Sequence, residues 1–388
     1  MKTEFEYIVL GLGGIGSAAA YWLSRRASGE VLGLEQYPIG HVRGGSQDHS
    51  RIIRLSYHKP HYVELAKAAY KAWTAVEDHA NEKLILQTGG LDFTHPAAQI
   101  PISDYTESMQ AADVPFEWLT AAEVMYRWPQ FRLPDHISAI YQAESGIAPA
   151  AKCMAAHLRL ARANGAVLQD NVGETAVTTH HDTISITTHD TTYHCHKLII
   201  AAGAWTNNLL AQLGHQIPLT ITQEQVVYYN TPHKADFMPD RFPIWIWMDV
   251  PSFYGFPVYG EDGPKVSEDV GGEEVTAETR SFEPNAAYQQ RLDNFVQQYI
   301  PNAYGPPLLA KTCLYTMPPD RDFVLATVPD QPNIAVAVGA AHAFKFSSLM
   351  GKILSELSID GGTHYEIAPF RLDRPILREA KPATSFMV

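Results

Sequence analysis

A glycine-rich turn near the start of the chain constrains the fold more than any other feature. Gly11-x-Gly13-x-x-Gly16 follows the short apolar run Tyr7–Leu10 and leads into the alanine-rich stretch Ile15–Arg25. The next apolar run, Val31–Glu35, ends in an acid. Runs of these lengths and periodicities predict a strand, a helix and a second strand. The chain therefore opens with a βαβ unit, which predicts a parallel sheet.

Each glycine of this turn has a geometric role in a dinucleotide site. The first allows the tight turn, the second lets the backbone approach a pyrophosphate, and the third lets the helix pack on the strand. The helix N-terminus offers free N–H groups to the phosphates, and Glu35 is placed to accept hydrogen bonds from ribose hydroxyls. The acid at Glu35 argues against NADP, but the motif leaves both FAD and NAD open.

Composition excludes several classes of function. The chain has 388 residues, enough for two domains, and a formal charge of −13. An acidic chain without a Lys/Arg-rich run is a poor partner for nucleic acid or an anionic membrane. Its three cysteines, Cys153, Cys195 and Cys313, form no CxxC pair, so we expect no metal site and no disulfide framework. We expect a cytoplasmic protein, because free thiols suit a reducing compartment.

Two later segments repeat the strand–glycine–helix pattern. Leu198–Ala202 precedes Gly203, and Ile334–Val338 precedes Gly339. Between them, residues 220–260 alternate β-formers with aromatics, which is typical of an antiparallel sheet. The pattern predicts one discontinuous domain with a second domain inserted into it. The Gly- and acid-rich segment Glu261–Glu274 predicts a mobile loop.

Several local patterns occur together, in order, along nearly the whole chain. Besides the glycine-rich turn they are Gly45-Ser46 with Ser50-Arg51-Ile52-Ile53-Arg54, Tyr254-Gly255-Phe256-Pro257, Lys265, Thr312-Cys313-Leu314-Tyr315-Thr316, His342-Ala343-Phe344-Lys345-Phe346 and Pro369-Phe370-Arg371. With them the chain resembles the monomeric sarcosine oxidase / N-methyltryptophan oxidase family. The resemblance implies an α/β (α+β) fold, in which a doubly wound, Rossmann-like FAD-binding domain is interleaved with a substrate domain on a mixed or antiparallel sheet. We expect the FAD-binding domain in residues 1–85, 146–218 and 313–388, and the substrate domain in residues 86–145 and 219–312.

The resemblance also implies how FAD is held. The family joins the 8α-carbon of its flavin to the cysteine of a Cys-x-Tyr-Thr context, which here is Cys313. The expected cofactor-binding positions are Gly11, Gly13, Gly14, Ile15, Gly16, Glu35, Ser46, Arg51, Val172, Gly203, Trp205, Cys313, Gly339, His342, Phe344 and Lys345. A buried structural cysteine is the alternative interpretation of Cys313, and a core histidine is the alternative for His342.

By the same resemblance, four residues are expected to be catalytic. Lys265 matches a lysine near flavin N5, where a cation would stabilise superoxide; the alternative is a solvated loop lysine. Arg51 is expected over the flavin ring, or else paired with an acid such as Glu64, and Tyr254 is expected in the pocket wall. Asp269 stands where the family usually has a histidine. An aspartate there would attract a cationic amine and raise its pKa, although oxidation needs the neutral amine.

The substrate carboxylate has its own expected site. Arg54 and Lys345 match the family's carboxylate-binding pair, and Tyr315 is expected in the same pocket. Ala341 and Ala343 replace usual glycines and would reshape the pocket, so sarcosine itself does not follow as the substrate. The resemblance implies flavin-dependent oxidation of an N-methyl (secondary) α-amino acid to an imine. The imine is hydrolysed to an amino acid plus an aldehyde, and O2 is reduced to H2O2.

Three other functions stay open on the sequence. They are a cyclic imino acid oxidase acting on proline- or pipecolate-like rings, an amine dehydrogenase with a non-oxygen acceptor, and a flavoprotein without catalysis. The expected partners are a small-molecule amino acid and O2, with no nucleic acid and no membrane. The resemblance suggests a monomer.

Overall fold

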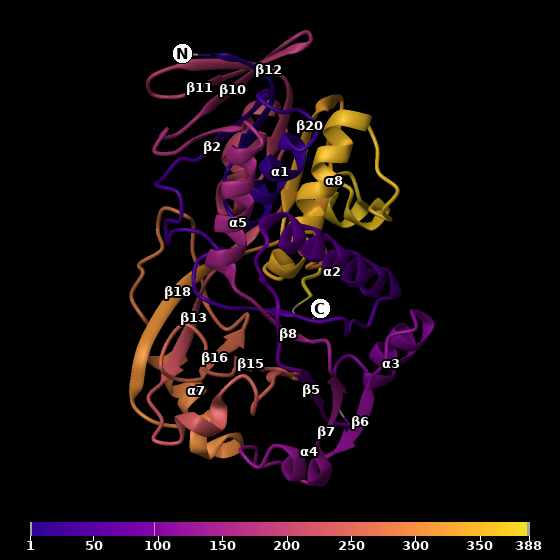
Figure 1. The fold of residues 1–388 in the computed structure, drawn as a ribbon, viewed down its shortest axis with the longest axis vertical. Helices are drawn as coiled ribbons and strands as arrows, with labels where there is room; N and C mark the ends of the chain where they lie inside the picture. The colour runs from indigo at the N-terminus through magenta and orange to yellow at the C-terminus, as the bar shows by residue number, and fades with distance from the viewer. Residues whose placement is uncertain (1, 97, 386–388) are drawn as a thin grey trace.

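Two large sheets and one small sheet make up the framework of the protein. The computed structural model describes residues 2–96 and 98–385. An eight-stranded sheet lies in the upper half of Figure 1 and a nine-stranded sheet in the lower half. This mixed arrangement of strands and helices confirms the predicted fold class.

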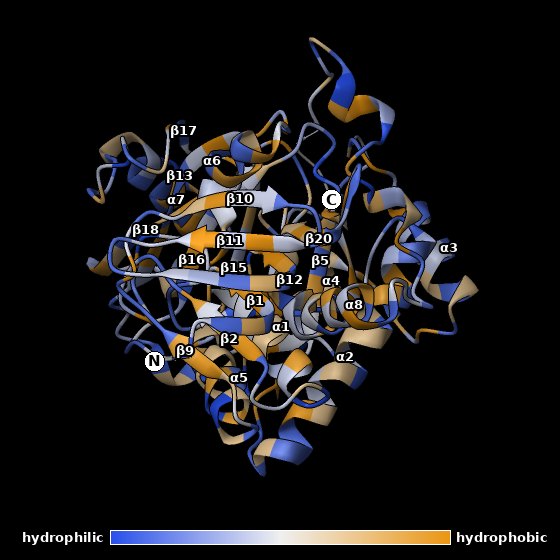
Figure 2. Cartoon of the chain, turned by 90° about the horizontal axis from the view of Figure 1, so that it is seen from above, coloured by the Kyte–Doolittle hydropathy of each residue, from blue (hydrophilic) through white to orange (hydrophobic). Residues whose placement is uncertain are grey.

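The eight-stranded sheet is built around the predicted βαβ unit. Its strands are β1 (Glu4–Leu10), β2 (Val31–Leu34), β9 (Val167–Gln169), β10 (Ala176–His180), β11 (Thr183–Thr187), β12 (Thr192–Ile200), β19 (Val324–Val328) and β20 (Gln331–Val338). β1 pairs in parallel with β2 on one side and with β12 on the other, and β9 and β20 extend the parallel part. Seen from above, β10, β11, β12, β1, β2 and β9 follow one another in this order (Figure 2).

Helices bury one face of this sheet. They are α1 (Gly14–Ser24), α2 (Pro60–Ala80), α5 (Ala150–Ala163) and α8 (Ser347–Asp360). α1 packs against α5 and α8, and α2 packs against both of these helices. Their core includes alternate residues of the strands, such as Val9 and Ile199. The other residues of the same strands, such as Ile8 and Ile200, enter a second core with the short helix α6 (Thr206–Leu210).

The nine-stranded sheet is mixed. Its strands are β5 (Gly90–Thr94), β6 (Glu117–Thr120), β7 (Ser138–Gln142), β13 (Thr220–Tyr229), β14 (Ile244–Trp247), β15 (Ser252–Phe256), β16 (Lys265–Asp269), β17 (Glu273–Glu274) and β18 (Pro307–Met317). Among the described strands of this sheet, β14 and β5 pair in parallel and the other pairs are antiparallel. Helix α7 (Ala286–Tyr299) covers it through Phe295, whose ring centroid lies 4.2 Å from that of Phe253. The remaining helices are α3 (Ile102–Ala111) and α4 (Ala121–Arg127).

One sequence expectation about this sheet is wrong. The segment 261–274 was predicted to be a loop, but its centre forms β16, which pairs with β13 and β15 on its two sides. Four of the five residues of β16 are buried. The predicted domain boundaries remain a prediction.

Three short strands form a third, separate sheet. It consists of β3 (Arg51–Ile53), β4 (Leu86–Gln87) and β8 (Gly146–Ala148). It fixes Arg51 opposite Ala148. Among the described residues, no helix combines the length and apolar character that crossing a membrane requires.

Candidate active site

A cavity of about 400 Å³ is lined by residues from both large sheets. That volume lies within the range of cofactor and substrate sites. Every predicted catalytic and substrate-binding residue lines it, and so does every predicted cofactor-binding residue except Gly16. The structure thus brings these residues to one place, while their roles stay predictions.

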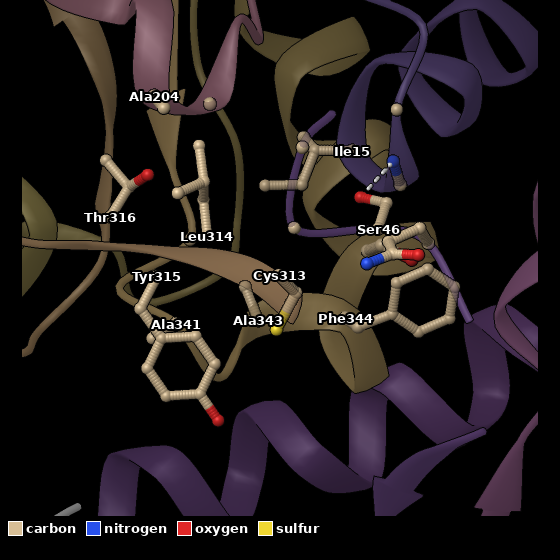
Figure 3. Close-up of a pocket in the computed structure, with 18 of the residues that line it drawn as sticks. Ile15, Ser46, Ala204, Cys313, Leu314, Tyr315, Thr316, Ala341, Ala343 and Phe344 are labelled. Atoms are coloured by element: carbon tan, nitrogen blue, oxygen red, sulfur yellow. Dashed lines mark hydrogen bonds between the residues drawn. The ribbon is translucent and has the colours of Figure 1, made fainter. Parts of the chain in front are cut away.

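The glycine-rich turn forms one end of the cavity. Gly11 has a φ of +88°, and Gly16 lies directly beneath it, because a Cβ on Gly16 would stand 1.8 Å from the Gly11 carbonyl oxygen. Helix α1 begins at Gly14 without a side-chain cap from its N-cap residue. The Gly14 N–H donates to Ser46 Oγ at 2.9 Å, the dashed line in Figure 3. This helix start is the anion-binding geometry of a dinucleotide site.

Glu35 stands beside the turn, at the end of β2. It is 7% exposed, and its Oε2 accepts the Leu12 N–H at 2.8 Å. His41 Nε2 lies 3.4 Å from Glu35 Oε1, and the Val172 N–H donates to the Glu35 carbonyl at 3.2 Å. A fixed carboxylate at this position suits ribose hydroxyls, so the residues present fit an adenine dinucleotide.

Cys313 lies on β18, facing the segment that carries Ala343 and Phe344 (Figure 3). Burial raises the pKa of the Cys313 thiol to about 11, and Arg51 acts against that shift. The Arg51 guanidinium donates to the carbonyl oxygens of Ser50 and Gly45, both at 2.8 Å. It is therefore held by backbone oxygens beside the cysteine.

Arg51 and Glu64 each have another partner. The predicted alternative pairing of these two residues is not the one found, because Glu64 pairs with Lys67 at 3.1 Å. Arg51 instead lies 4.0 Å from the carboxylate of Asp48.

Lys265 is a buried strand residue, so its interpretation as a solvated loop lysine is wrong. Its side chain is 1% exposed, and its Nζ donates to Asp48 Oδ2 at 3.0 Å and to the Ser50 carbonyl at 2.9 Å. Burial lowers the pKa of Lys265 to about 8, and Asp48 opposes this. Burial by itself would raise the pKa of Asp48, but Lys265 and Arg51 bring it well below its usual range.

Three more cations that line the cavity are Arg54, Lys345 and Arg321. Arg54 Nη1 donates to Asp92 Oδ1 at 2.9 Å. Lys345 Nζ donates to the His342 carbonyl at 3.0 Å. Burial lowers the pKa of Lys345 to about 7, and Arg54 adds to the shift.

The third cation is Arg321, which is 2% exposed and donates to Asp269 Oδ2 at 2.9 Å. Asp269, which is expected to attract a cationic amine, therefore already faces a cation of this chain, and its role toward an amine stays a prediction. The hydroxyls of Tyr254 and Tyr315 lie 3.3 Å apart on the same wall. His342 is half-buried, and its Nε2 hydrogen bonds to the Arg321 carbonyl at 2.9 Å.

Sequence reasoning missed Asp48, Asp92 and Arg321. Asp48 stands between two quoted motifs, Gly45-Ser46 and Ser50-Arg51, so its position was a usable signal. Arg321 lies between the Cys313 and His342 motifs, which is a weaker signal. Nothing in the local sequence marks Asp92, which lies on β5 and pairs with the cavity-lining Arg54.

Comparisons with known proteins agree with this geometry. The sequence model of the FAD dependent oxidoreductase family matches residues 6–357. Monomeric sarcosine oxidase of Streptomyces avermitilis is 35% identical over 379 residues, which are 95% of this chain and 97% of that protein. N-methyl-L-tryptophan oxidase of Salmonella heidelberg is 28% identical over 380 residues, 96% of this chain and 99% of that protein. The solved structure of NikD, an amino acid oxidase essential for nikkomycin biosynthesis, has a TM-score of 0.84 at 26% identity, covering 95% of this chain and 98% of its own.

Proposed function

The chain belongs to the FAD dependent oxidoreductase family, and on that premise we propose that it oxidises an N-methyl (secondary) α-amino acid, with O2 as the electron acceptor. The substrate loses two hydrogens across its carbon–nitrogen bond and becomes an imine. Water then splits the imine into an amino acid and an aldehyde, and O2 takes up two electrons and two protons to give H2O2. Bound FAD supplies the two-electron chemistry.

The charge balance at the substrate end carries this proposal. Arg54 faces Asp92 and Arg321 faces Asp269, whereas Lys345 has no carboxylate within ion-pair distance in the part of the chain described. One surplus positive charge suits one substrate carboxylate, with Arg54 beside it as the second donor group. Asp269 is one-quarter exposed at the cavity wall and would orient the amine.

The cofactor end supports a covalent FAD. The residues of the turn and Glu35 would hold the dinucleotide, and Cys313 would bond to the flavin. The Cys313 sulfur lies in the cavity, with the Arg51 guanidinium close enough to favour its thiolate. Lys265 and Arg51 would supply positive charge where the acceptor is reduced.

The proposal also includes a monomer in the cytoplasm. The Streptomyces avermitilis relative carries "monomeric" in its name, and Cys153, Cys195 and Cys313 are all free thiols. Sedimentation at the mass of one chain is the expected result, and a stable dimer would contradict it.

Spectroscopy of the purified protein tests the function. Sarcosine, N-methyl-L-tryptophan and L-pipecolate are each added without oxygen, and bleaching of the flavin absorbance near 450 nm is followed. We expect an N-methyl amino acid to bleach it fastest, and admission of air to restore the colour with one H2O2 per flavin. Faster bleaching by pipecolate would favour a cyclic imino acid oxidase, and bleaching without reoxidation by air would favour a dehydrogenase.

Acid precipitation tests the covalent link separately. Yellow colour is expected in the wild-type pellet and in the supernatant of the Cys313→Ala variant. Colour in the wild-type supernatant would contradict the link while leaving the oxidation reaction open.

A further inference from the structure

The Asp48 carboxylate accepts hydrogen bonds from three strands, two of which supply a lysine and one a tyrosine. Its side chain is 3% exposed. It accepts hydrogen bonds from Lys265 Nζ at 3.0 Å, Tyr228 OH at 2.8 Å and Lys311 Nζ at 3.4 Å. Arg51 Nη1 lies 4.0 Å away. One carboxylate therefore faces three cations.

The backbone of Asp48 is strained. Its φ is +81°, in the left-handed region that residues other than glycine rarely adopt. Such conformations persist only where the surroundings determine them, and they cluster at functional sites. Here the strain coincides with the contact between the carboxylate and Lys265.

We propose that Asp48 is a positioning residue that holds the ammonium of Lys265 at the cavity wall and keeps it charged. This inference rests on the proposed function, in which Lys265 acts where O2 is reduced. The Lys265 Nζ otherwise meets the Ser50 carbonyl and the face of Phe256, whose centroid is 4.0 Å away. Neither group replaces the attraction of a carboxylate for a buried ammonium.

The other titratable groups near Lys265 set the sign of the effect. Burial lowers the pKa of Lys265 to about 8, Asp48 opposes that shift, Arg51 adds to it and Cys313 weakly opposes it. Lys311 shares the Asp48 carboxylate and is a like charge. Asp48 is thus the group that favours the charged form of Lys265 against burial and Arg51.

Two variants are expected to shift the pH dependence of flavin reoxidation by O2 in opposite directions. Asp48→Asn keeps the size and tolerates the left-handed backbone but removes the charge, so the Lys265 pKa falls by about 1–3 units. Reoxidation by O2 slows above the pKa of Lys265. The pH at which it slows is therefore expected to fall by the same amount. Lys311→Met removes a repelling cation and moves that pH upward. Lys311 is 27% exposed, so this variant is expected to fold even if Asp48→Asn does not.

Anion binding gives a readout that does not depend on turnover. Without the Asp48 carboxylate, the site loses the counterion that Arg51 and Lys311 share, although Lys311 keeps Glu261 at 3.5 Å. Sodium nitrate, replacing sodium gluconate at constant ionic strength, is expected to raise the melting temperature of Asp48→Asn but not of the wild type. Asp262→Asn is the matched control, because Asp262 is 84% exposed and pairs with the exposed Lys234.

The outcomes separate this proposal from the function on which it rests. A folded Asp48→Asn with the pH profile and nitrate response of Asp262→Asn would overturn it. If Asp48→Asn does not fold, an unshifted pH profile for Lys311→Met would overturn it. Reoxidation of Lys265→Met at the wild-type rate would instead refute the acceptor role of Lys265, and the nitrate response would still report on Asp48.

Discussion

Three cations that line the cavity are each paired with an acid from another part of the chain. The pairs are Lys265 with Asp48, Arg54 with Asp92, and Arg321 with Asp269. Their members stand 217, 38 and 52 residues apart in sequence. Motifs reveal the cations Lys265 and Arg54, because those residues sit in recognisable local patterns. They do not reveal which acid meets which cation, because that depends on how distant strands are brought together.

The proposed role of Lys345 in binding the substrate carboxylate makes substrate binding depend on pH. Its pKa is lowered to about 7 by burial, so its ammonium is charged below that pH and neutral above it. The KM for the amino acid is therefore expected to rise as pH increases through about 7. Lys345→Met is expected to raise KM at pH 6 by about 10–100-fold, because a hydrogen bond to a charged group contributes roughly 1.5–3 kcal/mol.

The pH dependence itself is the control for this prediction. In Lys345→Met the rise of KM above pH 7 is expected to disappear, whereas it persists in the exposed-site variant Lys234→Met. A KM that rises with pH equally in all three proteins would show that another group titrates.

At the scale of elements, the opening βαβ unit followed from the sequence and β16 did not. The glycine-rich turn has one structural solution, so β1, α1 and β2 could be predicted with their order. The acids of β16 are typical of a loop, but in the sheet they have partners. Glu268 pairs with Arg291 on α7 at 2.7 Å, and Asp269 pairs with Arg321. A strand that carries such acids can be recognised only when the positions of their basic partners are known.

The contact between α1 and α8 depends on a missing side chain. A Cβ on Gly351 would stand 2.5 Å from the backbone carbon and the Cβ of Ala18. Gly351→Ala would gain about 1 kcal/mol of helix propensity, yet we expect a net loss of about 1–3 kcal/mol from overpacking. Urea unfolding measures the difference.

Gly362→Ala is the matched control for this helix contact. A Cβ there would meet nothing within 4 Å, so its stability is expected to stay within about 0.5 kcal/mol of the wild type. A Gly351→Ala protein as stable as this control would show that α1 and α8 separate easily.

At the scale of the whole molecule, the cavity depends on both large sheets, because residues of each sheet line it. The turn after β1 and the segment after β20 form its dinucleotide end, while β15, β16 and β18 supply Tyr254, Lys265 and Cys313. The fold class was predictable, since separated strand–glycine–helix segments indicate a discontinuous domain. The partners of Arg54 and Arg321 were less predictable. Asp92 on β5 lies in no recognised motif, and Asp269 on β16 was expected in the site but not as the partner of Arg321.

A ligand that touches both sheets is expected to stabilise them together. In Cys313→Ala the proposed covalent bond is absent, so free FAD becomes a reversible ligand of the folded state. At 100 times its Kd it would add about 2.7 kcal/mol to the free energy of unfolding. Calorimetry is therefore expected to show a melting temperature that rises with FAD concentration in this variant and is constant in the wild type.

ADP distinguishes coupling between the sheets from simple ligand binding. It fills only the end formed by the glycine-rich turn and Glu35, so it is expected to stabilise the eight-stranded half and to split the transition in two. FAD, which is proposed to reach the residues of β15, β16 and β18 as well, is expected to keep one transition and move it upward. A single transition that ADP raises as much as FAD does would show that the second sheet gains nothing from the flavin end. The covalent bond at Cys313 would then hold the cofactor without joining the two halves.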